Sequence, residues 1–220
     1  MEKLEKLVHI AQEMYRTGLV KGTSGNVSMR DPENYDRMWI TPSAIPYHKI
    51  TTKNLVEVDI RNNKVLNEGG YKPSSETPMH SSIYRLRSDV CAIVHTHSTY
   101  ATMFACAGEE IPAIHYLIAD IGDRIPVADY AIYGSEELAE KVVSTLQSTG
   151  SNGVLMKNHG VITVGETLDS AYTRAEIIEH VAQLAFGAKL MGSCQTLTPK
   201  QLEETRQKFV SYFAVAKDMR

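Results

Sequence analysis

The chain has 220 residues, of which 43% are hydrophobic, enough to bury one substantial core, and we expect a single domain over residues 1–220. The formal net charge of −3 and the absence of a Lys and Arg cluster argue against a nucleic-acid partner. No apolar run is long enough to span a membrane and the N-terminus lacks a secretory signal, so we expect a cytoplasmic protein.

The first half of the chain begins with a helical pattern and continues with extended segments. Apolar residues recur at helical spacing over residues 4–19, and Gly18 and Gly22 end that stretch. The short β-type segments that follow are residues 27–29, 38–40, 56–60 and 64–66. An Asn62-Asn63 turn joins the last two segments, and such short connections predict hairpins and therefore antiparallel strands.

The second half alternates helices and strands and ends in two long helices. The predicted helices cover residues 76–87, 99–105, 135–147, 168–191 and 199–215, and the predicted strands cover residues 90–96, 153–157 and 161–164. Thr198, Pro199 and Gln201 form a capping box with proline at the first helical position. Strands flanked by helices imply an α/β layered domain with a mixed or mainly antiparallel sheet.

The cysteines provide no evidence of a disulfide framework. Cys91, Cys106 and Cys194 are an odd number at no metal-knuckle or CxxC spacing, which is typical of reduced thiols in a cytosol. We interpret them as small buried apolar residues, with a catalytic thiol as the alternative.

Two histidines at the end of a predicted strand are the first candidate ligands of a metal. His95 and His97 are two residues apart, so on a strand both imidazoles project from the same face. A third histidine, His159, lies at a turn between two predicted strands, where Gly160 would permit a close backbone approach. Three histidines leave one position of tetrahedral Zn²⁺ open, as in catalytic sites. A chance HxH pattern on a polar strand end is the alternative.

A helix near this pair offers rival ligands. Glu76 and His80 are four residues apart, so one helix face could present a carboxylate and an imidazole together. We expect Glu76 to lie near the metal and His80 to be a packing or surface residue.

Hydroxyl-rich turns predict a site for an anion. The turns are residues 21–26, 41–44 and 72–75. The first has two glycines and could form a nest of backbone amides around an anion. Ser74 and Ser75 stand at a predicted helix N-terminus, where amides, hydroxyls and the helix dipole favour a phosphate, although Ser75 could simply cap the helix. Because Glu76 follows directly, a phosphorylated substrate would lie within reach of a base.

These motifs, in this order, resemble the class II aldolase family of the aldolase, epimerase and adducin type. The motifs are Gly25-Asn26-Val27-Ser28, Thr41-Pro42-Ser43, Pro73-Ser74-Ser75-Glu76, His95-Thr96-His97 and His159-Gly160. Residues 111–116 and 208–212 look closest to the L-fuculose-1-phosphate aldolase branch. The resemblance spans nearly the whole chain and implies an α/β domain with a central, mainly antiparallel sheet. It also implies a four-fold-symmetric homotetramer with active sites at the subunit interfaces.

The resemblance also implies roles for individual residues. His95, His97 and His159 would bind one Zn²⁺ per subunit, and Glu76 would be the acid/base that also approaches the metal. The residues that would hold the substrate phosphate are Gly25, Asn26, Ser43, Ala44, Ser74 and Ser75. Tyr116 and Tyr212 would come from a neighbouring subunit to the aldehyde half of the substrate, with packing at an interface as the alternative. Ala44 stands where the aldolase branch has glycine.

The implied reaction is the reversible retro-aldol cleavage of a ketose 1-phosphate, such as L-fuculose 1-phosphate, to dihydroxyacetone phosphate and an aldehyde such as L-lactaldehyde. A 4-epimerase of the same family would carry an aspartate at the position of Glu76, so the glutamate favours an aldolase. Dehydratases and decarboxylases of this family would keep the histidines. A non-catalytic binding module is the alternative from another class, and the retained histidines and Glu76 argue against it.

Overall fold

A computed structural model describes residues 2–67 and 69–218, and its centre is one seven-stranded sheet. The strands are β1 (Asn26–Arg30), β2 (Arg37–Ile40), β3 (Val56–Asp59), β4 (Ala92–Thr96), β5 (Val127–Ala128), β6 (Gly153–Met156) and β7 (Gly160–Gly165). Their order across the sheet is β3-β2-β1-β4-β7-β6-β5. Every neighbouring pair is antiparallel except β5 and β6, which are parallel. The expected mainly antiparallel sheet is confirmed.

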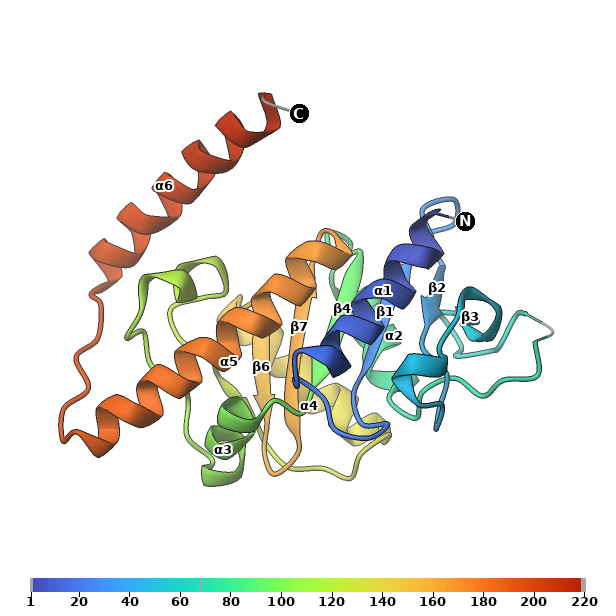
Figure 1. Ribbon diagram of the computed structural model, residues 1–220, viewed down its shortest axis with the longest axis horizontal. Coiled ribbons are helices and arrows are strands. Elements are labelled where there is room, and N and C mark those ends of the chain that lie inside the picture. Colours follow the sequence, from blue (N-terminus) through green and yellow to red (C-terminus); the bar gives the residue numbers. More distant parts are fainter. Residues whose placement is uncertain (1, 68, 219–220) are drawn as a thin grey trace.

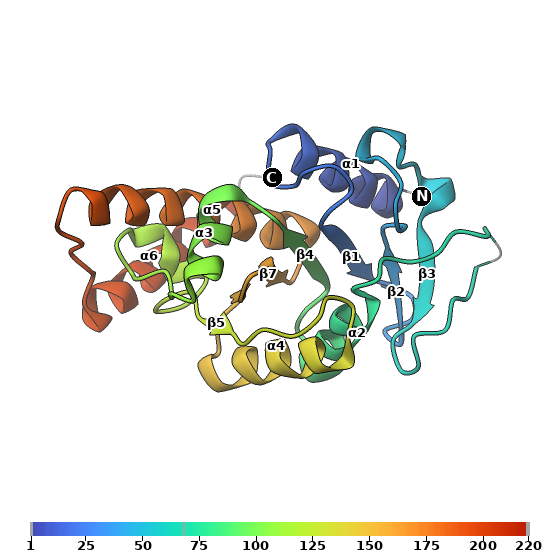
Figure 2. The same cartoon turned by 90° about the horizontal axis from the view of Figure 1, so that it is seen from below.

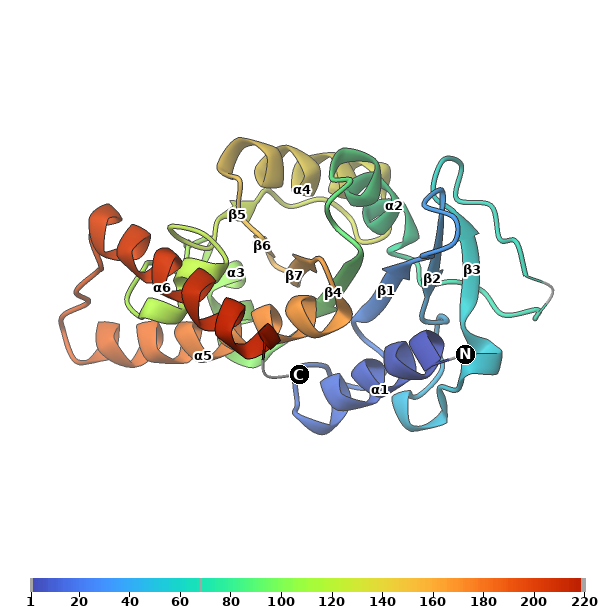
Figure 3. The same cartoon turned by 90° about the horizontal axis from the view of Figure 1, so that it is seen from above.

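Helices cover both faces of this sheet (Figure 1). They are α1 (Glu2–Arg16), α2 (Thr77–Leu86), α3 (Thr99–Ala107), α4 (Glu136–Thr149), α5 (Leu168–Leu190) and α6 (Pro199–Asp218). Seen from below and from above, α1 and α5 lie on one face, whereas α2 and α4 lie on the other (Figures 2 and 3). The expected α/β layered domain is therefore confirmed.

Each face of the sheet buries its own apolar cluster. Ile93 of β4 and Ile83 of α2 belong to the cluster under α2 and α4. Val94, the next residue of β4, packs on the other face with Leu7 and Met14 of α1. This alternation follows from the two-residue period of a strand. All five residues of β4 are buried, so its C-terminal end holds functional side chains against a packed core.

Some sequence predictions differ from the structure. Residues 64–66 form no strand, and only a single bridge joins Val65 to Val58. The two-residue strand β5 is too short to produce a periodic pattern. The cysteines are not buried, because Cys106 is exposed and Cys91 and Cys194 are half-buried, although all three are free thiols.

The C-terminal helix begins as predicted. The Thr198 hydroxyl accepts a hydrogen bond from the Gln201 amide at 3.3 Å, and Gln201 Oε1 accepts one from the Thr198 amide at 2.8 Å. This is the predicted capping box. The helix buries Leu202 near its start and then extends away from the body of the domain (Figure 1). Within the part of the chain that the structure describes, no helix is both long and apolar enough to cross a membrane.

Candidate active site

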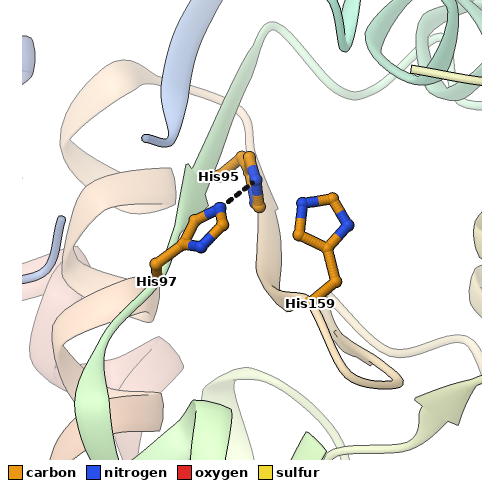
Figure 4. A group of neighbouring side chains, drawn as sticks. All are labelled: His95, His97 and His159. Carbon is orange, nitrogen blue, oxygen red and sulfur yellow. Dashed lines mark hydrogen bonds between the residues drawn. The ribbon is translucent and has the colours of Figure 1, made fainter. Parts of the chain in front are cut away.

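Three histidine side chains converge at the end of β4. His95 and His97 project from β4 and its end, and His159 comes from the turn between β6 and β7 (Figure 4). Their ring centroids are 4.8 to 5.1 Å apart, and one ligand nitrogen of each lies within 4.8 Å of the others. Antiparallel pairing of β4 with β7 brings the turn to the histidine pair.

The hydrogen bonds and the burial of these imidazoles suit a metal. The Val161 carbonyl oxygen accepts a hydrogen bond from His95 Nδ1 at 2.8 Å, so Nδ1 carries the proton and Nε2 presents a lone pair to the cluster. Burial lowers the pKa of His97, and burial and the neighbouring His97 lower the pKa of His159 to about 4. Burial first, and then His97 and His159, holds the pKa of His95 well below its usual value. Neutral imidazoles are the form that binds Zn²⁺, so the three residues fit the expected ion.

Gly160 is required by the close packing of this cluster. A Cβ atom on Gly160 would lie 2.4 Å from the Thr96 carbonyl oxygen and 3.2 Å from His95 Cε1. No side chain can be accommodated there without moving β4, because real Cβ atoms do not approach so closely. The sequence interpretation of Gly160 as a point of close backbone approach is therefore correct.

Glu76 lies in the same cavity, as the N-cap residue immediately before α2. It is 4% exposed, and its Oε2 has no hydrogen-bond partner among the described residues. Burial raises the pKa of the Glu76 carboxyl to about 7, and the Gly134 backbone N–H, which donates to it, opposes that shift. A carboxyl that titrates near neutrality can both give and take a proton at physiological pH.

His80 is separate from this cluster. It is fully buried, one turn after Glu76, and its Nδ1 is hydrogen-bonded to the Ser28 hydroxyl at 2.7 Å. The Ser28 hydroxyl also contacts the Tyr84 hydroxyl at 2.8 Å. His80 is therefore a core residue, as the packing interpretation predicts.

The three hydroxyl-rich turns meet around the same cavity, which has a volume of about 320 Å³. All six residues expected to hold the phosphate line it, together with Glu76 and the three histidines: Gly25, Asn26, Ser43, Ala44, Ser74 and Ser75. The turns are joined by hydrogen bonds from the Ser43 amide to the Lys72 carbonyl and from the Ser74 amide to the Thr41 carbonyl. Asn26 is 3% exposed, and its Oδ1 has no partner among the described residues.

Two details at this end of the cavity depart from simple expectation. Ser75 does not cap α2, because Glu76 is the N-cap residue and the Ser75 side chain is exposed toward the cavity. Ala44 has a φ of +61°, in the left-handed region that favours glycine. The sequence departure from glycine therefore falls at a position where the backbone conformation makes the difference costly.

Part of the cavity lining was not identified by the sequence analysis. These residues are Tyr130, Ala131, Ile132, Tyr133 and Asn158, whereas Thr23, Ser24 and Pro42, which also line the cavity, belong to the predicted turns. Gly134 fixes the loop that contains the two tyrosines, since a Cβ there would lie 3.0 Å from the Ser75 carbonyl oxygen. Tyr130, Ile132 and Tyr133 are more than half exposed. The signal that the sequence offered is a short run of aromatic and apolar residues, 130–133, just before the predicted helix at residues 135–147.

Of the two expected aldehyde-binding tyrosines, Tyr116 is not among the described residues that line the cavity. Tyr116 begins a 3-10 helix (Tyr116–Asp120), is 51% exposed, and packs near Phe209 of α6 with ring centroids 6.1 Å apart. Tyr212 lies on α6, but its side chain is outside the described residues.

Comparisons with known proteins agree with this geometry. A family model described as the class II aldolase and adducin N-terminal domain matches residues 5–186. An L-fuculose phosphate aldolase from Haemophilus influenzae is 38% identical over 215 residues, which cover 96% of this chain and 95% of that protein. A 5-deoxy-D-ribulose 1-phosphate aldolase from Bacillus thuringiensis is 36% identical over 208 residues, covering 94% and 95%. A solved L-fuculose 1-phosphate aldolase structure superposes with a TM-score of 0.89 at 38% identity, over 94% of this chain and 96% of that one.

Proposed function

This chain belongs to the class II aldolase family, and from that premise we propose that it cleaves a ketose 1-phosphate between C3 and C4. The products are dihydroxyacetone phosphate and a short aldehyde. The observation that carries the proposal is the one cavity that joins three imidazoles, the buried carboxyl of Glu76 and hydroxyl-rich turns suited to a phosphate. These groups lie around a volume of about 320 Å³, which is the scale of a small sugar phosphate.

The proposed reaction requires two proton transfers, one to C3 and one from the oxygen of the C4 hydroxyl. Breaking the C3–C4 bond leaves its electron pair on C3, where it delocalises into the C2 carbonyl, and the C4 hydroxyl loses its proton as the aldehyde forms. A Zn²⁺ ion bound to His95, His97 and His159 would supply Lewis-acid stabilisation of that negative charge. Glu76 delivers the proton to C3 in cleavage and removes it in condensation. In the metal-free chain, burial raises the pKa of Glu76 to about 7, whereas a bound cation would lower it, and these two effects oppose each other at the carboxyl that moves the proton.

The other end of the substrate is held by its phosphate. The backbone amide of Gly25 and the hydroxyls of Ser43 and Ser75 are donors available in the cavity, and the dipole of α2, whose first N–H groups are already hydrogen-bonded, favours an anion at its N-terminus. Because the phosphate-binding turns lead directly into Glu76, binding the phosphate sets the distance from C3 to the carboxyl.

We further propose that the aldehyde half ends in a methyl group. Ile132 and Tyr133 present apolar surface at the mouth of the cavity, which favours a deoxy-sugar end over a charged or hydroxylated one. The solved L-fuculose 1-phosphate aldolase and the 5-deoxy-D-ribulose 1-phosphate aldolase are both named for 1-phosphates of deoxy sugars.

A screen of phosphorylated ketoses tests this function. We expect dihydroxyacetone phosphate from L-fuculose 1-phosphate or 5-deoxyribulose 1-phosphate, loss of the activity on chelation, and recovery with added Zn²⁺. A ketose 5-phosphate in the same assay is the control for epimerisation. The proposal fails if no ketose 1-phosphate releases dihydroxyacetone phosphate, or if chelation leaves the rate unchanged.

We propose a homotetramer whose active sites are shared between neighbouring subunits. Since Tyr116 is exposed and lies outside the cavity lining of its own chain, we propose that it serves the C4 hydroxyl in a neighbouring subunit. Tyr212 has the same proposed role. Mixing inactive Glu76→Gln and Tyr116→Ala proteins under subunit exchange should restore activity, because a hybrid then contains complete sites. No restoration in a mixture shown to contain hybrids would assign Tyr116 to packing.

A further inference from the structure

Tyr47 is a buried tyrosine, and among the described residues its hydroxyl has one hydrogen-bond partner, which is a backbone carbonyl beside the cavity. It lies in a 3-10 helix (Tyr47–Lys49) and is 3% exposed. Its hydroxyl donates a hydrogen bond of 2.8 Å to the Ser24 carbonyl oxygen. Tyr47 is not among the residues that line the cavity, whereas Ser24 and Gly25 are. The tyrosine therefore contacts the turn at residues 21–26 from the side that faces away from the cavity.

The direction of this hydrogen bond determines the direction of the next amide. In a trans peptide unit, the C=O of one residue and the N–H of the next point in opposite directions. The Ser24 C=O points away from the cavity toward Tyr47, so the N–H of Gly25 points toward the cavity. Within residues 2–67 and 69–218, this N–H makes no internal hydrogen bond, so it is available to an anion.

The Ser24 hydroxyl in this turn is already hydrogen-bonded within the turn. The Ser24 hydroxyl donates to the Lys21 carbonyl at 2.7 Å and accepts from the Lys21 amide at 3.2 Å. No Lys or Arg lines the described cavity. Backbone amides therefore have to supply much of the attraction for a phosphate here, and a single misdirected peptide would place a carbonyl oxygen against the anion.

Gly25 and the packing of Tyr47 keep this peptide in one orientation. Gly25 has a φ of +75°, and a Cβ there would lie 2.6 Å from Val20 Cγ1 and 2.7 Å from the His95 carbonyl oxygen. The Tyr47 ring stacks on Tyr15 with an interplanar angle of 15°. Because the ring is held in place, its hydroxyl is a fixed donor.

We propose that Tyr47 is a positioning residue for phosphate binding: its hydroxyl holds the Ser24–Gly25 peptide so that the Gly25 N–H faces the substrate phosphate. This inference rests on the proposed ketose-phosphate function. It assigns to Tyr47 an effect on the affinity for phosphorylated compounds and none on the metal or on Glu76.

Tyr47→Phe tests this proposal, since it removes the hydroxyl and keeps the ring. We expect the KM for the ketose 1-phosphate to rise about tenfold, with kcat changed by less than about threefold. The reason is that the Gly25 N–H, no longer held in place, loses its hydrogen bond to the charged phosphate. The inhibition constant of inorganic phosphate should weaken by the same factor. Bound metal and the rate of C–H exchange in unphosphorylated dihydroxyacetone should not change. Tyr15→Phe is the matched control, because it keeps the ring stack and removes a hydroxyl without this bond.

The outcomes separate this inference from the proposed function. If wild-type protein is active on ketose 1-phosphates and Tyr47→Phe has wild-type affinity for phosphate, the positioning role is wrong and the function stands. A loss that is equal for phosphorylated and unphosphorylated compounds, together with a lower melting temperature, would also overturn it in favour of a structural role. If the wild type itself does not distinguish dihydroxyacetone phosphate from dihydroxyacetone, both the phosphate site and the role of Tyr47 are refuted.

Discussion

The metal end of the cavity is built from side chains, whereas the anion end is built mostly from backbone and short hydroxyls. His95, His97 and His159 form the metal end on or beside buried strands of the sheet. The anion end consists of residues 23–26, 42–44 and 74–75, and none of these residues is Lys or Arg. A substitution at the metal end deletes a ligand outright. At the anion end several donors contribute to phosphate binding, so a single substitution should weaken the affinity only in part.

The largest expected effect is the loss of one metal ligand. His159→Ala should abolish detectable bound metal and lower kcat at least about a thousandfold, because two imidazoles do not hold a catalytic ion tightly. His48→Ala, at an exposed position near the anion end, is the matched control and should keep both metal and activity. Elemental analysis and steady-state kinetics measure the two effects. Full metal content in His159→Ala would show that His159 is not a required ligand of the metal.

Glu76→Gln should separate the chemistry from the binding of the metal. The amide keeps the size of the carboxyl but cannot move a proton, so kcat should fall by a factor of about 10²–10⁴. Proton exchange at C3 of dihydroxyacetone phosphate should disappear while Zn²⁺ stays bound to the three histidines. The exchange is followed by NMR in deuterated water. Normal exchange in this variant would remove Glu76 from its proposed role.

Although Glu76→Gln should lower kcat, it should raise the stability of the metal-free protein at alkaline pH. The folded pKa of Glu76 is raised to about 7 by burial, so the favourable contribution of the neutral carboxyl is complete below its unfolded pKa and is lost as the pH rises through 7. At about pH 8, Glu76→Gln should stabilise the metal-free fold by up to about 3 kcal/mol, and at about pH 4 by little. Urea denaturation at the two pH values gives the difference. Equal effects at both would mean that the carboxyl is not desolvated.

The two ends also differ in what the sequence could reveal. The strand period placed His95 and His97 on one face, and the hydroxyl-rich turn before Glu76 pointed to an anion beside a base. Local patterns do not specify which strands are neighbours, so spacing alone made His159 only a candidate third ligand. The ordered motifs and their resemblance to a family then implied that His159 binds the metal together with His95 and His97.

The mouth of the cavity was missed for a different physical reason. Tyr130, Ile132 and Tyr133 form no motif with a metal-ligating or anion-binding spacing, and their place at the cavity depends on the close contact of Gly134 with Ser75. That contact joins residues far apart in the chain. Residues 64–66 were predicted as a strand because their local pattern is favourable. This prediction was wrong, since they pair with a neighbouring strand only through one bridge at Val65.

The smallest expected effect concerns Ala44 at the anion end. Its φ of +61° costs a residue with a Cβ more than it costs glycine, so Ala44→Gly should stabilise the protein by about 0.5–1 kcal/mol despite the added freedom of the unfolded chain. The KM for the substrate should change by less than about threefold, because the other donors stay in place.

Asn63→Gly is the matched control for this prediction. Asn63 has a φ of +60° in a turn that does not line the cavity, so its replacement should leave the KM unchanged. Asparagine tolerates the left-handed region better than alanine, so the gain in melting temperature should be smaller than for Ala44→Gly. A loss of stability in Ala44→Gly would show that the turn is not strained. A large rise in the KM of Ala44→Gly would show that the Ala44 methyl group itself orders the anion end. A single substitution at the anion end would then have a large effect, as it is expected to have at the metal end.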